Sequence, residues 1–249
     1  MSFSDTKLSG LSNNQVYSFF TFEFVELNNF PMKKNFLTQL SKSAVLILIL
    51  SSLSCNAQKT VTTTSLFNGD SLEGWKTVQQ SNQSIWSVID GIITGGDGIK
   101  KITSNTYLHT VKEYEDFEFR CLFKLTGDHG LGLINSGIQY RSTIKDNKII
   151  GYQADIGKGY WGDIYDEHRR GKLISGDLST LKHILKEDGW NSYIIRCVGS
   201  KHELYINGVK TCEYIETDKN IPSKGVFGLQ LHSGGNAKIE FKNITITQL

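Results

Sequence analysis

Alternating apolar and polar residues run through most of the chain beyond residue 65. Between Phe117 and Leu125, apolar Phe, Cys and Leu side chains occupy every second position, with charged Glu118, Arg120 and Lys124 between them. Side chains of a β-strand point to opposite faces in turn, so this stretch is predicted to be a half-buried strand. The same alternation recurs, separated by Gly, Asn and Asp residues, at 138–142, 151–156, 190–198, 203–212, 225–232 and 238–247.

Helical periodicity appears only in LSTLKHILK at 178–186, where Leu178, Leu181 and Leu185 fit one stripe. The dipeptide Asn207-Gly208 lies between two alternating runs and suits the left-handed positions of a tight hairpin turn. The chain has 24 glycines and only two prolines. Many strands with little helix predict an all-β fold, an antiparallel two-sheet sandwich or jelly roll.

A secretory signal peptide is predicted at 32–57. Lysines follow Met32, an apolar run covers 44–50, and small residues continue to Ala57. The apolar run is too short to cross a bilayer, which takes about 20 residues. Because a signal peptide normally stands at the amino terminus, we expect translation to begin at Met32 and residues 1–31 to be a non-native upstream extension.

The signal leaves two outcomes of export open. Cleavage before Cys55 would leave a cysteine that carries lipid, whereas Cys55-Asn56-Ala57 also suits a peptidase that releases soluble proteins. We therefore expect an exported bacterial protein, either periplasmic or an outer-membrane lipoprotein. The remaining chain is predicted to form a tether at 58–65 and a single domain at 66–249.

The charge of the exported part is close to zero. Residues 1–57 contain four of the 27 Lys and Arg and three of the 25 Asp and Glu, which leaves 23 against 22. Near-neutrality gives no electrostatic reason to expect nucleic acid or an anionic membrane as a partner.

For the cysteines and four isolated histidines, the sequence predicts no catalytic or metal-binding role. Cys121, Cys197 and Cys212 lack the close spacing of metal ligands, so we expect buried apolar thiols, with a Cys197–Cys212 disulfide as the alternative. Four histidines have no cluster of acids, Arg and aromatic residues around them like that at 151–173 and are expected at the surface; they are His109, His129, His183 and His202.

Three predicted strands present polar groups on one face. Alternation places Gln139 and Arg141 on one side of the 138–142 strand, opposite Ile138 and Tyr140. The same reasoning gives polar pairs in the two other strands, Gln153 with Asp155 and Gln230 with His232. A solvated outer face is the simple alternative. However, amide, guanidinium, carboxylate and imidazole groups suit a hydroxyl-rich ligand, so we predict a binding face on one sheet.

The loop after Ile156 is expected at the rim of that face. Tyr160, Trp161 and Tyr165 could stack on a sugar ring or form a small core under the loop. Charged groups crowd the same region and cannot all be buried without partners. Either a salt-bridge network or acid/base chemistry with an Arg anchor would explain them; they are Asp163, Asp166, Glu167, His168, Arg169 and Arg170.

Seven motifs in order resemble the 3-keto-disaccharide hydrolase-like domain family. They are LFNGDSLEGW (66–75), WSVIDGIITG (86–95), YEDFEFRCLFKL (114–125), NSGIQYRS (135–142), GYQADIGKGYWGDIYDEHRRGKL (151–173), GWNSYIIRCVGSKHELYINGV (189–209) and GLQLHSGGNAKIEFKNITI (228–246). The resemblance implies a concanavalin A-like or LamG-like jelly roll and an exported protein that processes oxidised sugars. Many members carry Glu where this chain has Gln153, so it looks like a subgroup with a QADIG strand and a YDE-x-RR loop.

The resemblance implies cleavage of 3-keto-glycosides, as a net hydrolysis through elimination and hydration. A ketone at carbon 3 acidifies the hydrogen on carbon 2, so a positioned base can remove it and form an enolate. Roles are expected as follows: Asp155, Glu167 and His168 as acid/base groups, Arg141 or Arg170 beside the enolate, His232 as a further proton carrier or ligand, and Gln139, Gln153, Gln230, Tyr160, Trp161, Tyr165 and Arg170 as substrate-binding groups.

Other functions remain open at this point. The same Asp, Glu and His groups are suitable ligands for a divalent metal ion, although no short metal motif is present. A jelly roll can also bind glycans without chemistry, as a carbohydrate-binding module or lectin. A retaining glucanase ranks last, because the 151–156 strand carries a single carboxylate, Asp155, where two about 5 Å apart would be needed.

Overall fold

The computed structural model describes residues 61–249. The predicted upstream extension at 1–31, the signal peptide at 32–57, the lipid on Cys55 and the beginning of the tether lie outside the described residues. Within 61–249, no helix combines the length and the apolar character needed to cross a membrane.

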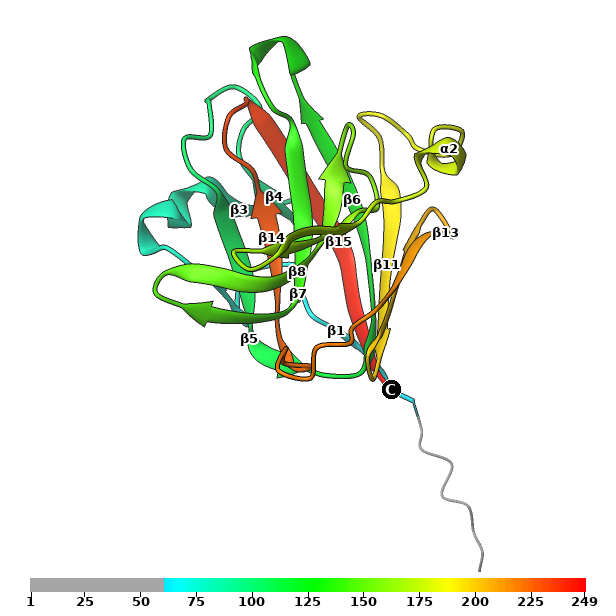
Figure 1. Ribbon diagram of the computed structural model, residues 1–249. Helices are drawn as coiled ribbons and strands as arrows, with labels where there is room; N and C mark the ends of the chain where they lie inside the picture. The colour runs from blue at the N-terminus through cyan, green and yellow to red at the C-terminus, as the bar shows by residue number, and fades with distance from the viewer. Residues whose placement is uncertain (1–60) are drawn as a thin grey trace, which may run out of the picture. The chain divides into compact units, whose positions relative to one another are not determined.

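Two antiparallel sheets form a jelly-roll sandwich (Figure 1). The order of the larger sheet is β13 (Val209–Ile215), β12 (Lys201–Ile206), β11 (Asn191–Val198), β6 (Phe117–Gly127), β15 (Ala237–Gln248), β4 (Ile92–Gly95) and β3 (Trp86–Ile89), and β1 (Thr63–Ser65) also pairs with β15. The order of the smaller sheet is β10 (Gly171–Ile174), β9 (Ile164–Glu167), β8 (Lys148–Gly157), β7 (Asn135–Lys145), β14 (Gly225–Leu231), β5 (Thr106–Tyr114) and β2 (Trp75–Thr77). The predicted all-β fold is therefore confirmed.

The core lies between the inner faces of the two sheets. Phe117 and Phe119 of β6 meet Phe227 of β14, with ring centroids 4.6 Å apart in each pair and all three side chains fully buried. Aromatic contacts of this kind contribute about 0.5–1.5 kcal/mol beyond the burial of area. The alternation predicted for 117–125 is therefore confirmed, because its apolar side faces this core.

Local elements agree with the sequence prediction at one turn and differ in the helix. Asn207 and Gly208 have φ angles of 50° and 81° and join β12 to β13, as predicted. The helix expected at 178–186 is reduced to α2 (Leu178–Leu181), because Leu181 is fully buried whereas Leu178 remains 40% exposed. Ile184 and Leu185 also pack against the core, but from the turns that follow α2. Within the described part of the chain, 61–249, two 3-10 turns accompany α2, namely η1 (Gln80–Ile85) and η2 (His129–Leu131).

Two segments are more ordered than the sequence suggested. Residues 63–65, predicted as part of a tether, form β1, because Thr64 and its neighbours pair with the last strand, β15. The strand β5 was missing from the predicted set, and it adds Tyr107 and His109 to the smaller sheet.

Buried thiols are confirmed, and one histidine prediction is wrong. Cys121, Cys197 and Cys212 are free and buried, so the alternative Cys197–Cys212 disulfide does not form. His202 is 1% exposed rather than at the surface, with its ring 4.4 Å from that of Tyr152. Burial lowers the pKa of His202 to about 3, so this imidazole is neutral at physiological pH.

Candidate functional site

Four neighbouring strands of the smaller sheet align one row of residues on the face turned away from the core. Asp155 of β8 pairs with Gly137 of β7, Gly137 pairs with Gln230 of β14, and Gln230 pairs with Tyr107 of β5. Directly paired residues of antiparallel strands project to the same face. The row therefore combines a carboxyl, an amide and a phenol on one surface, while Ala154, next to Asp155 along β8 and on the opposite face, belongs to the core.

A cavity of about 370 Å³ opens over this row. Its walls come from β8, β9 and β14 and from the connections beside them. Seven of the residues that the sequence singled out line it, namely Gln153, Asp155, Tyr160, Tyr165, Glu167, Gln230 and His232. Three other lining residues were not anticipated, namely Asn105, Leu133 and Asn135.

A chain of hydrogen bonds leads across the sheet to the Asp155 carboxyl. Ser142 Oγ donates to Gln139 Oε1 (3.2 Å), and Gln139 Nε2 donates to Gln153 Oε1 (2.6 Å). Gln153 Nε2 in turn donates to Asp155 Oδ1. Gly137 makes room for this path, since a Cβ there would lie 2.6 Å from Gln153 Cγ and Cδ. All members are buried, so the chain holds Asp155 Oδ1 in place and leaves Oδ2 for other partners.

Burial sets the protonation of Asp155. The side chain is 3% exposed, and loss of solvation raises its pKa to about 7. The hydrogen bond from Gln153 and the charge of Lys172 act in the opposite direction, while the neighbouring carboxylates Asp163 and Glu167 raise the pKa further. A carboxyl that titrates near neutral pH in a cavity can both accept and return a proton.

A second carboxyl, Glu167, lies on the β9 side of the cavity. Tyr107 Oη donates to Glu167 Oε1 at 2.8 Å, and burial raises the pKa of the Tyr107 phenol, so the phenol remains a donor. The amides of Asn105 and Gln230 each donate to Tyr107 Oη at 3.4 Å. The cavity therefore holds two carboxyl groups with different partners, one fixed by an amide and one by a phenol.

Gln230 carries a buried acceptor without a partner. Its side chain is fully buried and lines the cavity, yet its Oε1 receives no hydrogen bond from any described residue. A buried amide oxygen left in this state costs about 1–3 kcal/mol. A donor such as a ligand hydroxyl would remove that cost, so Gln230 fits a role in ligand binding.

The ring of His232 has a defined proton position. Its Nδ1 lies 2.6 Å from the carbonyl oxygen of Ser233, so Nδ1 carries the hydrogen and donates it. The backbone of His232 is fixed as well, because its N–H donates to the carbonyl of Asn135 (3.1 Å). In the neutral ring, Nε2 is then an acceptor for a proton or a ligand hydroxyl.

Arg141 does not enter the cavity, so its predicted placement beside Asp155 and His232 is wrong. The φ angle of Arg141 is 47°, and the pairing of β7 with β8 shifts register between Tyr140 and Thr143. The regular alternation of side chains between the two faces of β7 therefore stops at Tyr140, before Arg141. The guanidinium instead donates to the carbonyls of Glu115 (2.8 and 2.9 Å) and Gly199 (2.7 Å) and pairs with Asp116.

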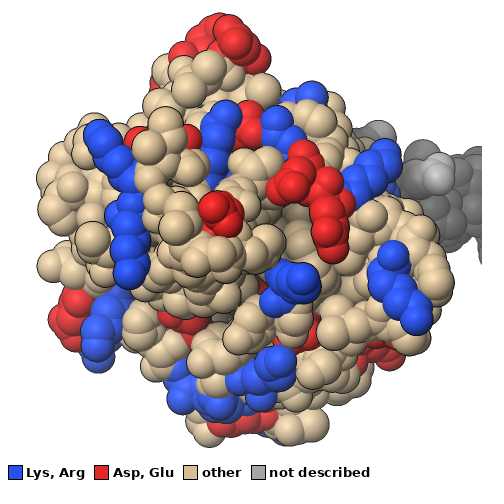
Figure 2. All heavy atoms as spheres, turned by 90° about the horizontal axis from the view of Figure 1, so that it is seen from above, with Lys and Arg blue, Asp and Glu red and all other residues tan. Residues whose placement is uncertain are grey.

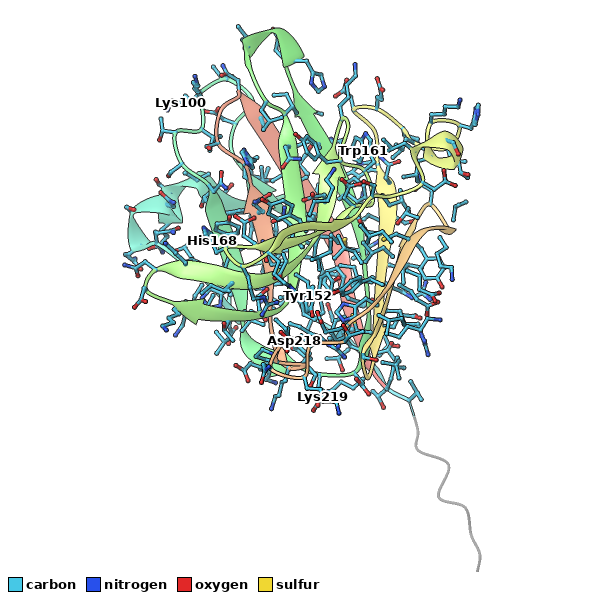
Figure 3. All side chains as sticks on the ribbon, in the orientation of Figure 1. Lys100, Tyr152, Trp161, His168, Asp218 and Lys219 are labelled. Atoms are coloured by element: carbon cyan, nitrogen blue, oxygen red, sulfur yellow. The ribbon has the colours of Figure 1, made fainter. Side chains whose placement is uncertain are left out.

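Four other predicted site residues lie outside the cavity lining. Gln139 is buried beneath it, and Arg170 pairs with Asp166 (2.5 Å) and Glu216 (2.6 Å). His168 Nδ1 donates to the carbonyl of Ile149, whereas Trp161 packs on Phe123 with ring centroids 6.2 Å apart. Figure 3 shows Trp161 and His168 at the two ends of the β9 ribbon.

The charged residues at 163–170 belong to two groups, one in a salt-bridge network and one beside the cavity. Asp166 is fully buried and pairs with Arg169 and Arg170, which is the salt-bridge network. Glu167, next along β9, lines the cavity. Alternation along this short strand separates the two groups by face.

Lys172, a cation beside the cavity, was not predicted from the sequence. Its Nζ lies 2.6 Å from Asp163 Oδ2 and 5.2 Å from the centroid of the Tyr160 ring. Asp163 is 1% exposed, its Oδ1 accepts from the N–H of Gly176 (2.8 Å), and its carbonyl accepts from the N–H of Asp155 (3.0 Å). A lysine on a short edge strand resembles any solvated residue in a sequence, so no local signal pointed to it.

The carboxylates and His232 do not form an evident metal centre. Within residues 61–249, no three His, Cys, Asp or Glu side chains are grouped so that they could hold one ion. Asp155 Oδ1 and Glu167 Oε1 already accept hydrogen bonds from Gln153 and Tyr107.

Surface charge agrees with the near-neutral composition. Figure 2 shows Lys and Arg side chains interspersed with Asp and Glu on the face seen from above. A continuous basic surface, which binding of nucleic acid would need, is not visible on that face.

Comparison with known proteins gives one family match, which covers most of the chain. The family described as 3-keto-alpha-glucoside-1,2-lyase-like domain matches residues 62–247. None of the curated proteins compared with the chain matches it.

Solved structures of similar fold include two from Parabacteroides distasonis, both provisionally assigned as glycosyl hydrolases. One has 22% identity and a TM-score of 0.55, with 75% of this chain and 94% of that chain covered. The other has 25% identity and a TM-score of 0.53, with coverages of 76% and 100%. The carbohydrate-binding module CBM66 from Bacillus subtilis has 18% identity and a TM-score of 0.52, with coverages of 70% and 96%.

Proposed function

The chain belongs to the 3-keto-alpha-glucoside-1,2-lyase-like domain family, and from that premise we propose that it cleaves 3-keto-glycosides by elimination followed by hydration. The fold and the family make it a carbohydrate-active protein of the glycosyl-hydrolase-like jelly-roll type. The proposal adds the substrate class, the reaction and the residues that carry it out.

One observation supports the proposal above the others. Asp155 is buried at the floor of the cavity with a pKa of about 7, and Gln153 holds one of its two oxygens. Removal of the carbon 2 hydrogen needs a base whose conjugate acid can also return a proton near neutral pH. Asp155 Oδ2 meets both requirements.

The reaction proceeds in two balanced stages. Asp155 takes the hydrogen from carbon 2, and the electron pair forms an enolate with the oxygen on carbon 3. Collapse of the enolate restores the ketone, forms a double bond between carbons 1 and 2, and expels the aglycone from carbon 1 with a proton from an acid. Water then adds to carbon 1 while carbon 2 regains a proton, so the sum is hydrolysis.

Glu167 and His232 are the groups placed to serve the leaving group and the water. Both line the cavity with Asp155, and each has one fixed partner, Tyr107 for Glu167 and the carbonyl of Ser233 for His232. We assign the proton of the aglycone to Glu167 and the activation of water to His232 Nε2. His168 is given no direct role, because it does not line the cavity.

Stabilisation of the enolate must come from neutral donors. Among the described residues, 61–249, no Lys or Arg belongs to the cavity lining. Arg141 and Arg170, first considered for this task, are held by other partners outside it. Neutral donors in the cavity lining include the Asn135 amide and the hydroxyl groups of Tyr160 and Tyr165, and preorganised donors of this kind can replace a formal charge.

A noncatalytic carbohydrate-binding module is the second candidate. The fold of CBM66 is similar, and Tyr160 offers a 38% exposed ring at the mouth of the cavity. Fold alone does not decide between binding and chemistry. The buried Asp155 carboxyl favours chemistry, because sugar binding alone gives no reason to bury this group with a raised pKa.

The deciding experiment compares an oxidised substrate with its parent. Purified protein is mixed with a 3-keto-glucoside and with the unoxidised glucoside, and release of the aglycone is followed. We expect release from the 3-keto-glucoside alone. Binding of both sugars at micromolar concentration with turnover of neither would instead identify a binding module.

Cellular location and subgroup are separate proposals. We propose export through the signal at 32–57, lipidation of Cys55, and membership of the subgroup with the QADIG strand and YDE-x-RR loop. Mass spectrometry of the protein purified from membranes tests the first two. An acylated Cys55 terminus supports them, whereas a peptide from residues 1–31 contradicts them.

A further inference from the structure

Two exposed apolar side chains stand at the mouth of the polar cavity. Leu133 and Tyr160 both line it, and each is 38% exposed. A single exposed leucine on a protein surface needs no explanation. Two large apolar groups on different loops, both turned to one cavity, do need one.

The backbone around Leu133 is fixed rather than free. A Cβ on Gly132 would lie 2.0 Å from the carbonyl oxygen of Gly234, and one on Gly235 would lie 2.2 Å from that of Leu133. The next residue, Ile134, is 3% exposed and anchors the segment in the core. The loop between β6 and β7, at the top of Figure 1, therefore holds Leu133 outward at a set position.

Tyr160 is held at the same end of the sheet. Its N–H donates to the carbonyl of Gly157 (2.9 Å), and Lys172 Nζ lies 5.2 Å from its ring centroid. Gly157 pairs with Asn135, and a Cβ on Gly157 would lie 2.8 Å from Asn135 Nδ2. This close approach brings the loop of Tyr160 against the strand that follows Leu133.

The cavity thus has two chemically different sides. Asp155, Gln153 and Gln230 supply carboxyl and amide groups on the sheet floor, and Gln230 Oε1 lacks a donor among the described residues. Leu133 and the Tyr160 ring supply an apolar wall at the mouth. A sugar ring satisfies the polar floor, whereas Leu133 has no group that can pair with a hydroxyl, and an apolar group fits between it and the Tyr160 ring.

We propose that Leu133 and Tyr160 form an aglycone subsite, so that the preferred substrate is a sugar joined to an apolar, aromatic-sized group rather than to a second sugar. The inference rests on the proposed function, because that function places the sugar ring over Asp155. The apolar group leaves water on binding. A phenyl group buries more apolar surface than a methyl group, so a phenyl glycoside should bind more tightly.

Binding of matched glycosides tests the subsite without requiring turnover. The probes are methyl and phenyl glucosides of both anomers and their 3-keto derivatives, titrated by calorimetry into the full protein carrying Asp155→Asn. We expect the phenyl compound to bind at least about 10-fold more tightly than the methyl compound of the same sugar. Adding Leu133→Ser should reduce that ratio to about 3 or less.

Leu131 provides the matched control. It lies on the same loop and is 56% exposed, but it does not line the cavity, so Leu131→Ser should leave the ratio unchanged. Tyr160→Ser is the second variant, with the same expected loss as Leu133→Ser. Thermal unfolding of each variant confirms that it is folded before its affinities are compared.

The outcomes separate this inference from the proposed function. Equal binding of methyl and phenyl probes, binding of neither up to millimolar concentration, or equal effects of the Leu131 and Leu133 changes would overturn the subsite. Absence of turnover of 3-keto-glucosides by the unmodified protein, with the phenyl preference intact, would instead overturn the reaction and leave the subsite standing.

Discussion

Gln153 donates a hydrogen bond from its amide nitrogen to Oδ1 of Asp155, two residues further along the same strand. Residues two apart on a strand share a face, and Gly137 on the neighbouring strand leaves room for the Gln153 side chain to cross between them. This contact orients the carboxyl and lowers its pKa against the larger effect of burial.

Removing the amide should shift the pH dependence of catalysis. In Gln153→Leu, Asp155 loses a hydrogen bond that favours its charged form, so its pKa rises above about 7. The limb of kcat/KM that reports the ionised base should move to higher pH by about one unit. An unchanged limb would show that a group other than Asp155 is titrating.

Neutralising Asp155 should affect activity and stability in opposite directions. Asp155→Asn should lower turnover of a 3-keto-glucoside by at least about 100-fold, because no carboxylate remains to take the proton. In the unmodified protein, the pKa of Asp155 is raised from 3.8 to about 7, so the native state binds more protons than the unfolded state between these two pH values. The free energy of unfolding of the unmodified protein therefore falls as pH rises from about 4 to about 7.

The variant lacks this titration, which gives the measurement. At pH 8 its free energy of unfolding should exceed that of the unmodified protein by up to about 4 kcal/mol, and at pH 4 the two should nearly coincide. Urea unfolding at the two pH values tests this. A difference that does not change with pH would contradict the raised pKa.

Lys172 should adjust the same titration from outside the cavity. Its positive charge lowers the pKa of Asp155, and its ammonium pairs with Asp163 and lies on the Tyr160 ring. Lys172→Met should move the pH limb upward and weaken substrate binding, whereas Lys172→Arg keeps the charge and should restore the limb. If activity fell at all pH values and the pH limb of kcat/KM did not move, Lys172 would have only a structural role.

Changes at Glu167 and at its partner Tyr107 should reduce turnover to different extents. Glu167→Gln should reduce turnover by about 100-fold if it supplies the proton to the aglycone. Tyr107→Phe removes the donor that orients Glu167, together with the acceptor of the Asn105 and Gln230 amides, and should cost about 10-fold. Substrates whose aglycone leaves readily need less help from an acid, so the loss in Glu167→Gln should shrink for a nitrophenyl aglycone. An equal loss for all aglycones would assign Glu167 another role.

Strand alternation predicted the polar face because most of the site lies on regular strands. Asp155, Gln153 and Gln230 could be placed from a period of two alone, and the structure puts them around one cavity. Arg141 has the same sequence signal, yet its positive φ at a register shift turns it away. Such an irregularity depends on contacts with Glu115 and Gly199, which are far apart in the sequence.

Other parts of the site were hidden for similar reasons. Tyr107 orients Glu167, which is 60 residues away, and no local pattern connects the two. Leu133 resembles an ordinary loop residue until Gly132 and Gly235 are seen to fix its backbone. His202 was expected at the surface because no cluster of site-like residues accompanies it in the sequence, although three tyrosine rings from other strands surround it.

The most direct test of the account follows the hydrogen on carbon 2. A 3-keto-glucoside carrying deuterium at carbon 2 is incubated with the purified protein, and the released 3-keto-glucose is analysed by mass spectrometry. If Asp155 removes that hydrogen, the deuterated substrate releases its aglycone more slowly than the protiated one, deuterium that exchanges from Asp155 into water is missing from the product, and Asp155→Asn releases product at least about 100-fold more slowly. Product that forms at full rate with its deuterium retained would mean direct displacement at carbon 1 and would contradict the central claim.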